Sequence, residues 1–561
     1  MRVLVTGATG TVGRQVMTDL RAAGVEVTGL SRSGPVRGDL ADPASLRVEA
    51  DAVFLVWPFA TVDGLAEALD ALPAGRIVYL SSAAARPHEV AAERLIAASG
   101  RPWTVLRPHV FAANARRWAA AIRAGGVVRE PYGQASTAPV HEKDIAALAV
   151  RALLEDGHDG RTYELTGPDS LTQAEQVRII GEVVGRPARW EEGSVEEARE
   201  RMLAMGWPAD EILAAQEALT LRPAPVLGAA VHSFRSWVAS HAHLFLGVAG
   251  AARFHGYGEP VVYEEVPMPV GEVLVKVAAT SFNASETALW SGALRDVLPL
   301  ALPYTVGWDV SGTVVETGPG VTAWAVGDRV IGRVDAGGTA AEYVAVPADL
   351  LVAAPASIPL ADAAALPVAG LTAWQAVVEH GRVRAGERVL INGAGGGVGG
   401  FAVQLARRAG AHVIATAGPR SAAAVRALGA DEVVDYTTTP LPYGVDLVIN
   451  LAPVSEEAAA ELGTLGDRTV TVATPVPGGT HFVARNDTAQ LARLVALVDA
   501  GSLVVDVSER LPMTSIGEVY DRALAGQVRG KIVLQSVLRN SGVPSPGRSS
   551  ALSAAKMVRS S

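Results

Sequence analysis

The sequence of 561 residues contains no cysteine. Disulfide bonds, thiolate nucleophiles, iron–sulfur clusters and every zinc site that uses a cysteine ligand are therefore excluded. Lysine is also scarce, and arginine carries almost all of the positive charge. The lysines are Lys143, Lys276, Lys531 and Lys556. A mechanism that needs a catalytic lysine accordingly has few candidates in this chain.

Long apolar runs and an excess of positive charge are missing as well. No apolar run reaches about 18 residues, which argues against a membrane span. The N-terminus shows no basic segment and no cleavage site of an export signal, so we expect a cytoplasmic protein. The formal net charge of -10 argues against a general affinity for nucleic acid. With 49% apolar and 19% charged residues, a chain of this length predicts two or more globular domains.

Two glycine-rich turns, far apart in the chain, carry most of the functional signal. Each follows a short apolar run, Val3-Leu4-Val5 or Val389-Leu390-Ile391, and precedes a helical pattern. At such turns the missing side chains let the backbone approach a pyrophosphate, and the helix N-terminus offers unpaired N–H groups. We therefore predict two dinucleotide sites. Their cofactor-binding residues are Gly7, Thr9, Gly10, Thr11, Val12 and Gly13 in the first turn, and Gly393, Gly395, Gly396, Gly397, Val398 and Gly399 in the second.

The apolar pattern predicts how the chain is organised. Residues 1–155 alternate strand and helix patterns, which predicts a parallel sheet covered by helices, and a smaller lobe follows. The strands expected in this sheet are Arg2–Thr6, Glu26–Leu30, Ala52–Val56, Arg76–Leu80 and Trp103–Leu106, and the helices include Val12–Ala23 and Val90–Ala98. Runs between residues 253 and 352 predict a compact antiparallel barrel. Alternation of strand and helix patterns returns over residues 388–472.

The predicted domain boundaries follow from these changes of pattern. They are 1–245 for the first dinucleotide-binding unit, 246–250 for a linker, 251–365 for the β-rich domain, 366–504 for the second dinucleotide-binding domain, and 538–561 for a disordered tail. The segment 505–537 is expected to return to the β-rich domain.

The residue that follows the second strand of each α/β unit indicates the cofactor. NAD sites place an acidic residue there to accept from the ribose 2′-OH. The first unit instead reads Gly29-Leu30-Ser31-Arg32, and the guanidinium of Arg32 can hold a 2′-phosphate. This pattern favours NADP(H), with a solvated surface arginine as the alternative interpretation of Arg32.

The N-terminal half resembles the NmrA-like atypical short-chain dehydrogenase/reductases over most of residues 1–245. The resemblance rests on the first glycine turn and on Gly38-Asp39-Leu40, Tyr79-Leu80-Ser81-Ser82, Pro102-Trp103-Thr104-Val105-Leu106-Arg107-Pro108 and Asp144-Ile145-Ala146. It implies that Asp39 and Leu40 flank the adenine, and that Ser82, His88 and Glu93 could line the pocket. Ordinary short-chain reductases use a Tyr-x-x-x-Lys pair, in which the ammonium lowers the pKa of the tyrosine. No tyrosine stands four residues before Lys143, so that pair is missing.

The C-terminal half resembles the zinc-free quinone oxidoreductases of the zeta-crystallin type, within the medium-chain dehydrogenase/reductase superfamily. The resemblance covers residues 250–537. It rests on the second glycine turn and on Gly307-Trp308-Asp309-Val310-Ser311-Gly312, Gly327-Asp328-Arg329-Val330, Leu366–Trp374, Leu428-Gly429-Ala430-Asp431 and Arg529–Leu534. It implies a GroES-like barrel domain and NADPH as the donor. Asn283 and Thr372 are then expected to orient the nicotinamide carboxamide or the acceptor, with Lys531 near the cofactor and Arg420 and Tyr436 near the 2′-phosphate.

The acceptor side departs from this family's pattern. Many quinone-reducing relatives carry Asn-Pro-Val-Asp followed by a tyrosine and an arginine that face the acceptor. This chain reads Asn283-Ala284-Ser285-Glu286, with Ala288 and Trp290 in place of the tyrosine and the arginine. The change widens or desolvates the acceptor side, which suggests an aromatic polyketide-like enone besides simple quinones.

The sequence therefore predicts an α/β protein with two Rossmann-type doubly wound parallel sheets and a β-rich barrel. The predicted function is hydride transfer from NADPH to a quinone or an α,β-unsaturated carbonyl without zinc, fused to a second NADP-binding reductase-like domain. The alternative is a single-site reductase whose N-terminal half senses NADP or acts as a scaffold. The expected partners are small molecules and, as in many relatives of the C-terminal half, a second copy of the chain.

Overall fold

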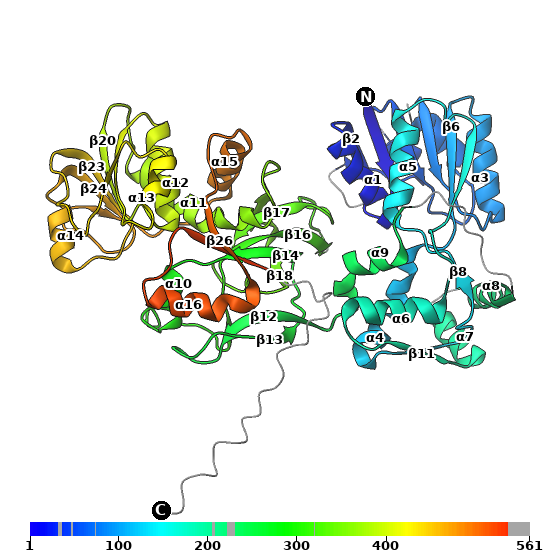
Figure 1. The fold of residues 1–561 in the computed structure, drawn as a ribbon. Helices are drawn as coiled ribbons and strands as arrows, with labels where there is room; N and C mark the ends of the chain where they lie inside the picture. The colour runs from blue at the N-terminus through cyan, green and yellow to red at the C-terminus, as the bar shows by residue number, and fades with distance from the viewer. Residues whose placement is uncertain are drawn as a thin grey trace, which may run out of the picture.

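The computed structural model describes residues 1–31, 36–46, 49–72, 75–204, 208–221, 231–318 and 320–536. Figure 1 shows an N-terminal α/β body and a second body that combines a β-rich barrel with another α/β domain. Arg32 and the tail 538–561 lie outside the described residues, so their predicted roles stay predictions. Within the described residues, no helix is long and apolar enough to span a membrane.

The N-terminal sheet confirms the predicted parallel arrangement. Its strands are β1 (Arg2–Thr6), β2 (Glu26–Ser31), β3 (Val36–Arg37), β4 (Ala52–Val56), β5 (Arg76–Leu80), β6 (Trp103–Pro108) and β9 (Arg161–Leu165). All pairs are parallel, in the order β3-β2-β1-β4-β5-β6-β9. The order reverses between β1 and β4, and ligands bind at the carboxyl ends of strands beside such a switch point.

Helices cover both faces of this sheet, which is why its strands are almost continuously apolar. They are α1 (Thr11–Ala22), α2 (Leu65–Ala71), α3 (Pro87–Ala98) and α5 (Glu142–Leu154). The first and the last share one core cluster with Val3, Val5 and Phe54, whereas α2 and α3 share another with Leu4 and Leu55. Helix α3 begins three residues before the prediction, because a proline stands in its first turn and Glu89 closes a capping box.

A smaller lobe follows the sheet. Its elements are α4 (Ala119–Gly125), β7 (Val127–Glu130), β8 (Ser136–Thr137), β10 (Leu171–Thr172), α6 (Gln173–Val184), β11 (Arg189–Glu192), α7 (Val195–Ala204), α8 (Ala209–Leu221) and α9 (Phe234–Ser240). Two short pairs, β8 with β10 and β7 with β11, hold the lobe together.

The β-rich barrel forms where the sequence predicted it. Its strands are β12 (Val248–Phe254), β13 (Val262–Pro267), β14 (Val273–Ser281), β15 (Tyr304–Thr305), β16 (Asp309–Thr317), β17 (Arg329–Arg333), β18 (Tyr343–Val346), β19 (Leu351–Ala353), β26 (Val507–Pro512) and β27 (Lys531–Gln535). Strand β14 pairs with β16, β18 and β27, so the last strand of the described chain closes a sheet begun more than two hundred residues earlier.

The second parallel sheet has six strands in the order β22-β21-β20-β23-β24-β25. They are β20 (Arg388–Asn392), β21 (His412–Thr416), β22 (Glu432–Val434), β23 (Val445–Asn450), β24 (Gly466–Thr471) and β25 (Thr480–His481). The helices of this half are α10 (Ser285–Trp290), α11 (Pro367–Trp374), α12 (Gly397–Arg408), α13 (Ala422–Ala427), α14 (Glu456–Leu462), α15 (Thr488–Asp499) and α16 (Ile516–Leu524). The second glycine turn connects β20 to α12, again at a switch point.

Short helical turns complete the described chain. They are η1 (Pro43–Ser45), η2 (Ala112–Trp118), η3 (Ala242–Leu244), η4 (Ala348–Leu350), η5 (Asp362–Ala365), η6 (Gln375–His380) and η7 (Met513–Ser515).

The two halves pack against each other through the small lobe. One core cluster joins Phe234, Trp237 and Leu246 of the first half to Leu274 and Tyr343 of the barrel. The predicted linker 246–250 runs directly from η3 into β12, and Leu246 is buried in this shared cluster. The contact between the halves is therefore apolar and continuous with their cores.

Candidate functional site

The first glycine turn is shaped by close backbone packing. Gly7 adopts φ +62, which favours glycine. A Cβ on Gly13 would lie 2.3 Å from the carbonyl oxygen of Gly7, so α1 rests directly on the turn. Gly10 differs, because its φ of −77 suits any residue and an added Cβ would come no closer than 3.2 Å to that same oxygen. Gly10 thus leaves room on the outer side of the turn, where a pyrophosphate can approach.

The second glycine turn repeats this design. Gly393 adopts φ +85, and a Cβ on Gly399 would lie 2.5 Å from backbone atoms of Ala394. Gly396 is the N-cap of α12 with φ −85, and its nearest neighbour to an added Cβ is 3.4 Å away. Gly10 and Gly396 are therefore equivalent positions of two nucleotide-type turns, and both turns fit a dinucleotide.

The second turn also touches the C-terminal strands. A Cβ on Gly397 would lie 2.5 Å from Cδ of Lys531. The amide of Gly530 donates to the carbonyl of Gly395 at 3.1 Å. The aliphatic part of Lys531 consequently forms a wall of the turn, while its ammonium points elsewhere.

That ammonium lies in a buried polar network beneath the turn. Lys531 Nζ donates to Asn283 Oδ1 at 2.8 Å and to the carbonyl of Phe282 at 3.1 Å, and lies 3.6 Å from Asp309 Oδ2. Burial lowers the pKa of Lys531, while Asp309 and Glu286 oppose this effect. Asn283 Nδ2 donates to Asp309 Oδ2 at 2.9 Å. The structure thus brings Asn283 and Lys531 together, and both polar ends of Asn283 are engaged.

Asp309 extends the network to α11. Its Oδ1 accepts from the amide of Val368 at 2.7 Å, and its Oδ2 also accepts from Ser281. Thr372, on the next turn of α11, donates its hydroxyl to the carbonyl of Val368 at 2.7 Å and is 8% exposed. Asp309 therefore links the barrel strand β16 to the helix that carries Thr372, although no sequence signal had marked it as more than part of a motif.

Glu286 forms the far end of the same network. Its Oε1 accepts from Asn283 at 3.1 Å, and its Oε2 accepts from the amide of Gly307 at 2.9 Å and from the hydroxyl of Tyr520 at 3.3 Å. Burial raises the pKa of Glu286 to about 7. It also raises the pKa of Tyr520, and Glu286 adds to that shift. Near neutral pH the network therefore holds a proton that an exposed carboxylate would have released.

This proton makes stability depend on pH. Since the folded state keeps it to higher pH than the unfolded chain, its stabilising contribution is full below the ordinary pKa of 4.5 and is lost as pH rises through about 7. We expect Glu286→Gln to remove this loss of stability. The slopes of the free energy of unfolding against pH should then differ between wild type and variant by the equivalent of up to about one bound proton over this window. Hydrogen exchange of barrel amides at several pH values measures the effect. Parallel pH profiles for the two proteins would contradict it.

The residues expected near the second 2′-phosphate lie on an exposed edge. Arg420 follows β21, and its Nη2 donates to the carbonyl of Gly526 at 2.9 Å. Tyr436 follows β22 and is 61% exposed. Because β21 and β22 are parallel neighbours, both side chains lie at the carboxyl edge of the sheet.

Around the first turn, the predicted residues serve local structure as well. Leu40 is buried in the sheet core, and Asp39 Oδ1 accepts from the amide of Ala41 at 3.0 Å. Ser82 follows β5 and donates to Glu89 Oε2 at 2.7 Å. Glu93 is paired with Arg107, and although burial disfavours its charge, hydrogen bonds from Arg107 and Ser81 lower its pKa. Glu93 is thus ionised at neutral pH and is no proton donor there.

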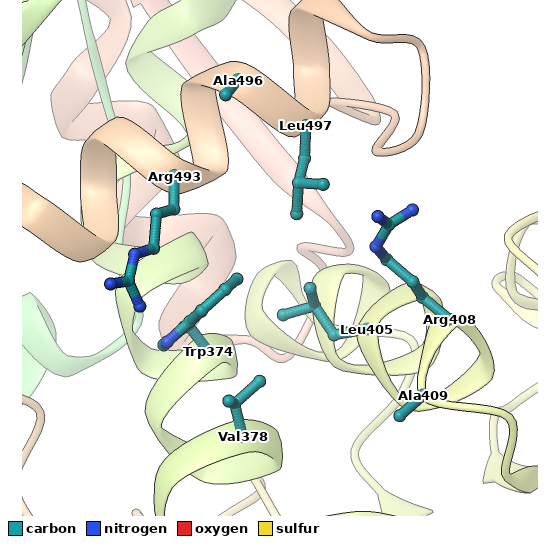
Figure 2. Close-up of a pocket in the computed structure, with 8 residues that line it drawn as sticks. All are labelled: Trp374, Val378, Leu405, Arg408, Ala409, Arg493, Ala496 and Leu497. Carbon is teal, nitrogen blue, oxygen red and sulfur yellow. The ribbon is translucent and has the colours of Figure 1, made fainter. Parts of the chain in front are cut away.

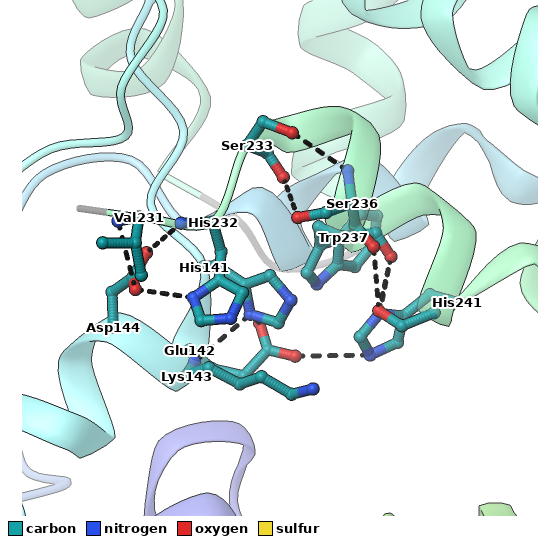
Figure 3. Close-up of polar contacts among 11 residues, drawn as sticks. His141, Glu142, Lys143, Asp144, Val231, His232, Ser233, Ser236, Trp237 and His241 are labelled. Carbon is teal, nitrogen blue, oxygen red and sulfur yellow. Dashed lines mark hydrogen bonds and ion pairs between the residues drawn. The ribbon is translucent and has the colours of Figure 1, made fainter.

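A histidine cluster joins α5 to α9. His141 Nδ1 accepts from the amide of Lys143 at 3.2 Å, and His241 Nε2 lies 3.3 Å from Glu142 Oε1 (Figure 3). Burial lowers the pKa of His243 to about 3. His241 is the C-cap of α9. The cluster itself was not predicted, because its members come from segments about a hundred residues apart.

An apolar pocket of about 460 Å³ opens between α11, η6, α12 and α15 (Figure 2). Trp374, Val378, Leu405 and Leu497 line it, and Arg408 and Arg493 flank it. It lies at the C-terminal end of α12, whereas the glycine turn lies at the N-terminal end. It is therefore separate from the nucleotide turn.

Three family descriptions match the chain. They are the alcohol dehydrogenase GroES-like domain over residues 269–356, the zinc-binding dehydrogenase over 428–534, and the NAD dependent epimerase/dehydratase family over 3–71. The donor set does not fit zinc, since the chain lacks cysteine and the described residues include no group of three or more His, Asp or Glu that could hold a metal ion.

Individual proteins match one part of the chain each. A chloroplastic quinone oxidoreductase of Triphysaria versicolor is 31% identical over 331 residues, which span 51% of this chain and 98% of that protein. A (4-alkanoyl-5-oxo-2,5-dihydrofuran-3-yl)methyl phosphate reductase of Streptomyces griseus is 36% identical over 278 residues, or 43% of this chain and 99% of that protein. The solved quinone oxidoreductase of Coxiella burnetii is 28% identical, covers 51% of this chain and 99% of its own, and has a TM-score of 0.48.

Proposed function

Because the C-terminal half of the chain belongs to the quinone oxidoreductase family of medium-chain dehydrogenase/reductases, we propose that it reduces quinones or α,β-unsaturated carbonyl compounds with NADPH and without zinc. The observation that carries this proposal is the shape of the second glycine turn. There is free space outside the turn at Gly396, and the aliphatic part of Lys531 packs against its other side. NADPH, when bound, supplies a hydride to the electrophilic carbon of the acceptor, and solvent supplies the balancing proton.

The residues of the chain act in this proposal by binding and positioning. The open side of the turn receives the pyrophosphate, and the amide groups at the start of α12 favour its negative charge. The network of Lys531, Asn283 and Asp309 fixes β27, β14 and α11 relative to one another, so these residues would give the nicotinamide end of bound NADPH a rigid surface. Positioning and electrostatics then provide the rate enhancement.

The acceptor is proposed to be flat and aromatic or conjugated. Trp290 replaces the arginine of many relatives, and its Nε1 donates to the carbonyl of Glu259 at 2.5 Å. Its ring meets Tyr520 edge to face at 6.2 Å. This fixed aromatic wall suits quinones, enones and aromatic polyketide-like enones better than a charged acceptor.

For the N-terminal half, which contains a domain of the epimerase/dehydratase type, we propose an NmrA-like NADP site. Gly7, Gly10 and Gly13 support binding, because their turn has the same geometry as the second one. Because the Tyr-x-x-x-Lys pair is missing, we also propose a second candidate function for this half. In it, the N-terminal half binds NADP as a sensor or scaffold, and only the C-terminal half reduces substrate.

The proposed preference for NADPH has a direct test at Arg420. We expect Arg420→Gln to raise the KM for NADPH about tenfold and to leave the KM for NADH unchanged, because the guanidinium would pair with the 2′-phosphate. Initial rates with a quinone acceptor measure both constants. Arg426→Gln, an exposed arginine on the following helix, is the matched control. Equal effects on the two cofactors would contradict the role of Arg420.

The proposed reaction itself is tested by following NADPH oxidation with a panel of quinones, linear enones and polycyclic aromatic enones. We expect turnover with members of this panel and none with simple aldehydes. Turnover of aldehydes alone would overturn the proposed acceptor class.

A further inference from the structure

A pocket of about 390 Å³ lies between the two halves, beside the first glycine turn. One wall belongs to the first half and contains Ala8 and Thr9 of the turn, one face of α1, and Val27, Thr28 and Gly29 of β2. The other wall is the connection between β16 and β17 of the barrel, which Figure 1 shows on the side that faces α1. The residues of this connection that line the pocket are Val321, Thr322, Ala323, Trp324 and Ala325, and Thr317 at the end of β16 adjoins them.

The first wall carries positive charge without a carboxylate. Arg14 and Arg21 line the pocket, and none of the described residues that line it is acidic. Arg21 stands in the last turn of α1, where the helix C-terminus stabilises a cation. Arg14 has no such explanation. Its Nη2 donates to the carbonyl of Thr9 at 2.8 Å, and it forms no ion pair with any other described residue.

The surroundings of Arg14 make an anion favourable there. Its side chain is half-buried, so burial lowers its pKa, and the nearby Arg116 adds to this effect. An uncompensated, partly desolvated guanidinium beside a nucleotide-type turn gains strongly from a phosphate. In α/β units the adenosine ribose lies between the first turn and the end of the second strand. Thr9 of the turn and Gly29, two residues before the end of β2, both border this pocket.

The second wall is rigid. Trp324 Nε1 donates to the carbonyl of Ala348 at 2.8 Å, and the amide of Ala325 donates to Asp328 Oδ2 at 2.7 Å. Val321 and Trp324 pack on the barrel core. The barrel therefore presents a fixed apolar and hydroxyl-bearing surface to whatever occupies the pocket.

We propose that this pocket holds the phosphorylated adenosine end of an NADP molecule bound to the first half, with Arg14 on its 2′-phosphate and Trp324 of the barrel closing the site. The inference rests on the proposed NADP site of the N-terminal half, and adds that the second half completes it. Occupancy of the first site then stabilises the packing of the two halves, and that packing strengthens binding by the same factor.

Binding of adenosine 2′,5′-bisphosphate and of 5′-AMP to the full chain tests this inference by calorimetry. Gly396→Val is included in every protein to block the second site. We expect Arg14→Gln to weaken the bisphosphate about tenfold and to leave 5′-AMP unchanged, since only the former carries the 2′-phosphate. We expect Trp324→Ala to weaken both ligands several-fold. Trp374→Ala, a tryptophan of the other pocket, is the matched control and should change neither.

A second measurement tests directly whether the ligand contacts the barrel side of the pocket. Hydrogen exchange at residues 321–325 should slow when the bisphosphate binds, and Gly10→Val should abolish the protection. If the bisphosphate binds and neither Arg14→Gln nor Trp324→Ala weakens its binding, this inference is wrong, whereas the proposed N-terminal NADP site remains supported. No binding of the bisphosphate to the Gly396→Val protein, or binding unaffected by Gly10→Val, would overturn the N-terminal NADP site as well.

Discussion

Gly396→Val is expected to lower kcat/KM for NADPH at least a hundredfold while changing the free energy of unfolding by less than about 1 kcal/mol. The reason is geometric. Gly396 has φ −85, and an added Cβ meets nothing nearer than 3.4 Å, so the backbone tolerates the side chain. The branched side chain nevertheless occupies the space through which a pyrophosphate reaches the amides of α12. Steady-state oxidation of NADPH with a quinone, together with thermal unfolding, measures both quantities.

Two matched substitutions make this result interpretable. Gly399→Ala places its Cβ 2.5 Å from backbone atoms of Ala394, so it should destabilise the second half rather than block the ligand selectively. Gly10→Val repeats the change at the equivalent position of the first turn, where the nearest atom is 3.2 Å away. Loss of turnover only in Gly396→Val favours a sensor or scaffold in the N-terminal half. Partial loss in both variants favours two working sites, and full activity in both would refute both turns.

Lys531→Met is expected to destabilise the barrel by about 3–5 kcal/mol, because it leaves the fully buried Asp309 without its cation. Asp309 also orients α11 through Val368, so the loss should spread to that helix. Hydrogen exchange of amides in β14 and β27 measures this change locally, which is preferable in a chain of several domains.

The double variant Lys531→Met with Asp309→Asn should recover part of the lost stability, since it removes the stranded charge. Lys143→Met, at an exposed lysine of the first half, should leave exchange in β14 and β27 unchanged. If Lys531→Met is as stable as wild type, the ion pair does not support the barrel, and the double variant would then show no recovery.

The elements of the fold were predictable because each depends on its own residues. Runs such as Arg2–Thr6 and Ala52–Val56 form the strands expected of them, since both faces of a parallel strand are covered and the central residues of each run are apolar. The first and last residues of the helices were less predictable where capping residues determine them. Helix α3 begins early because Pro87 and Glu89 stabilise its first turn.

Both glycine turns join a strand to a helix, as their sequence patterns predict, and their role in binding a cofactor stays a prediction. The engagement of Asn283 by Lys531 and Asp309 was not predicted, because it depends on strands that meet only in the folded barrel. The histidine cluster and the pocket lined by Arg14 and Trp324 likewise join segments distant in the chain. No local pattern encodes such contacts, because they arise from how whole elements pack.

The pairing of β14 with β27 has a consequence for biosynthesis. The N-terminal sheet uses strands that all leave the ribosome within the first third of translation, so it can fold while the rest is being made. The barrel cannot close in this way. The end of β14, residues 279–281, must wait for residues 531–535, and this part of its edge remains exposed to chaperones and to aggregation until almost the whole polypeptide has been synthesised.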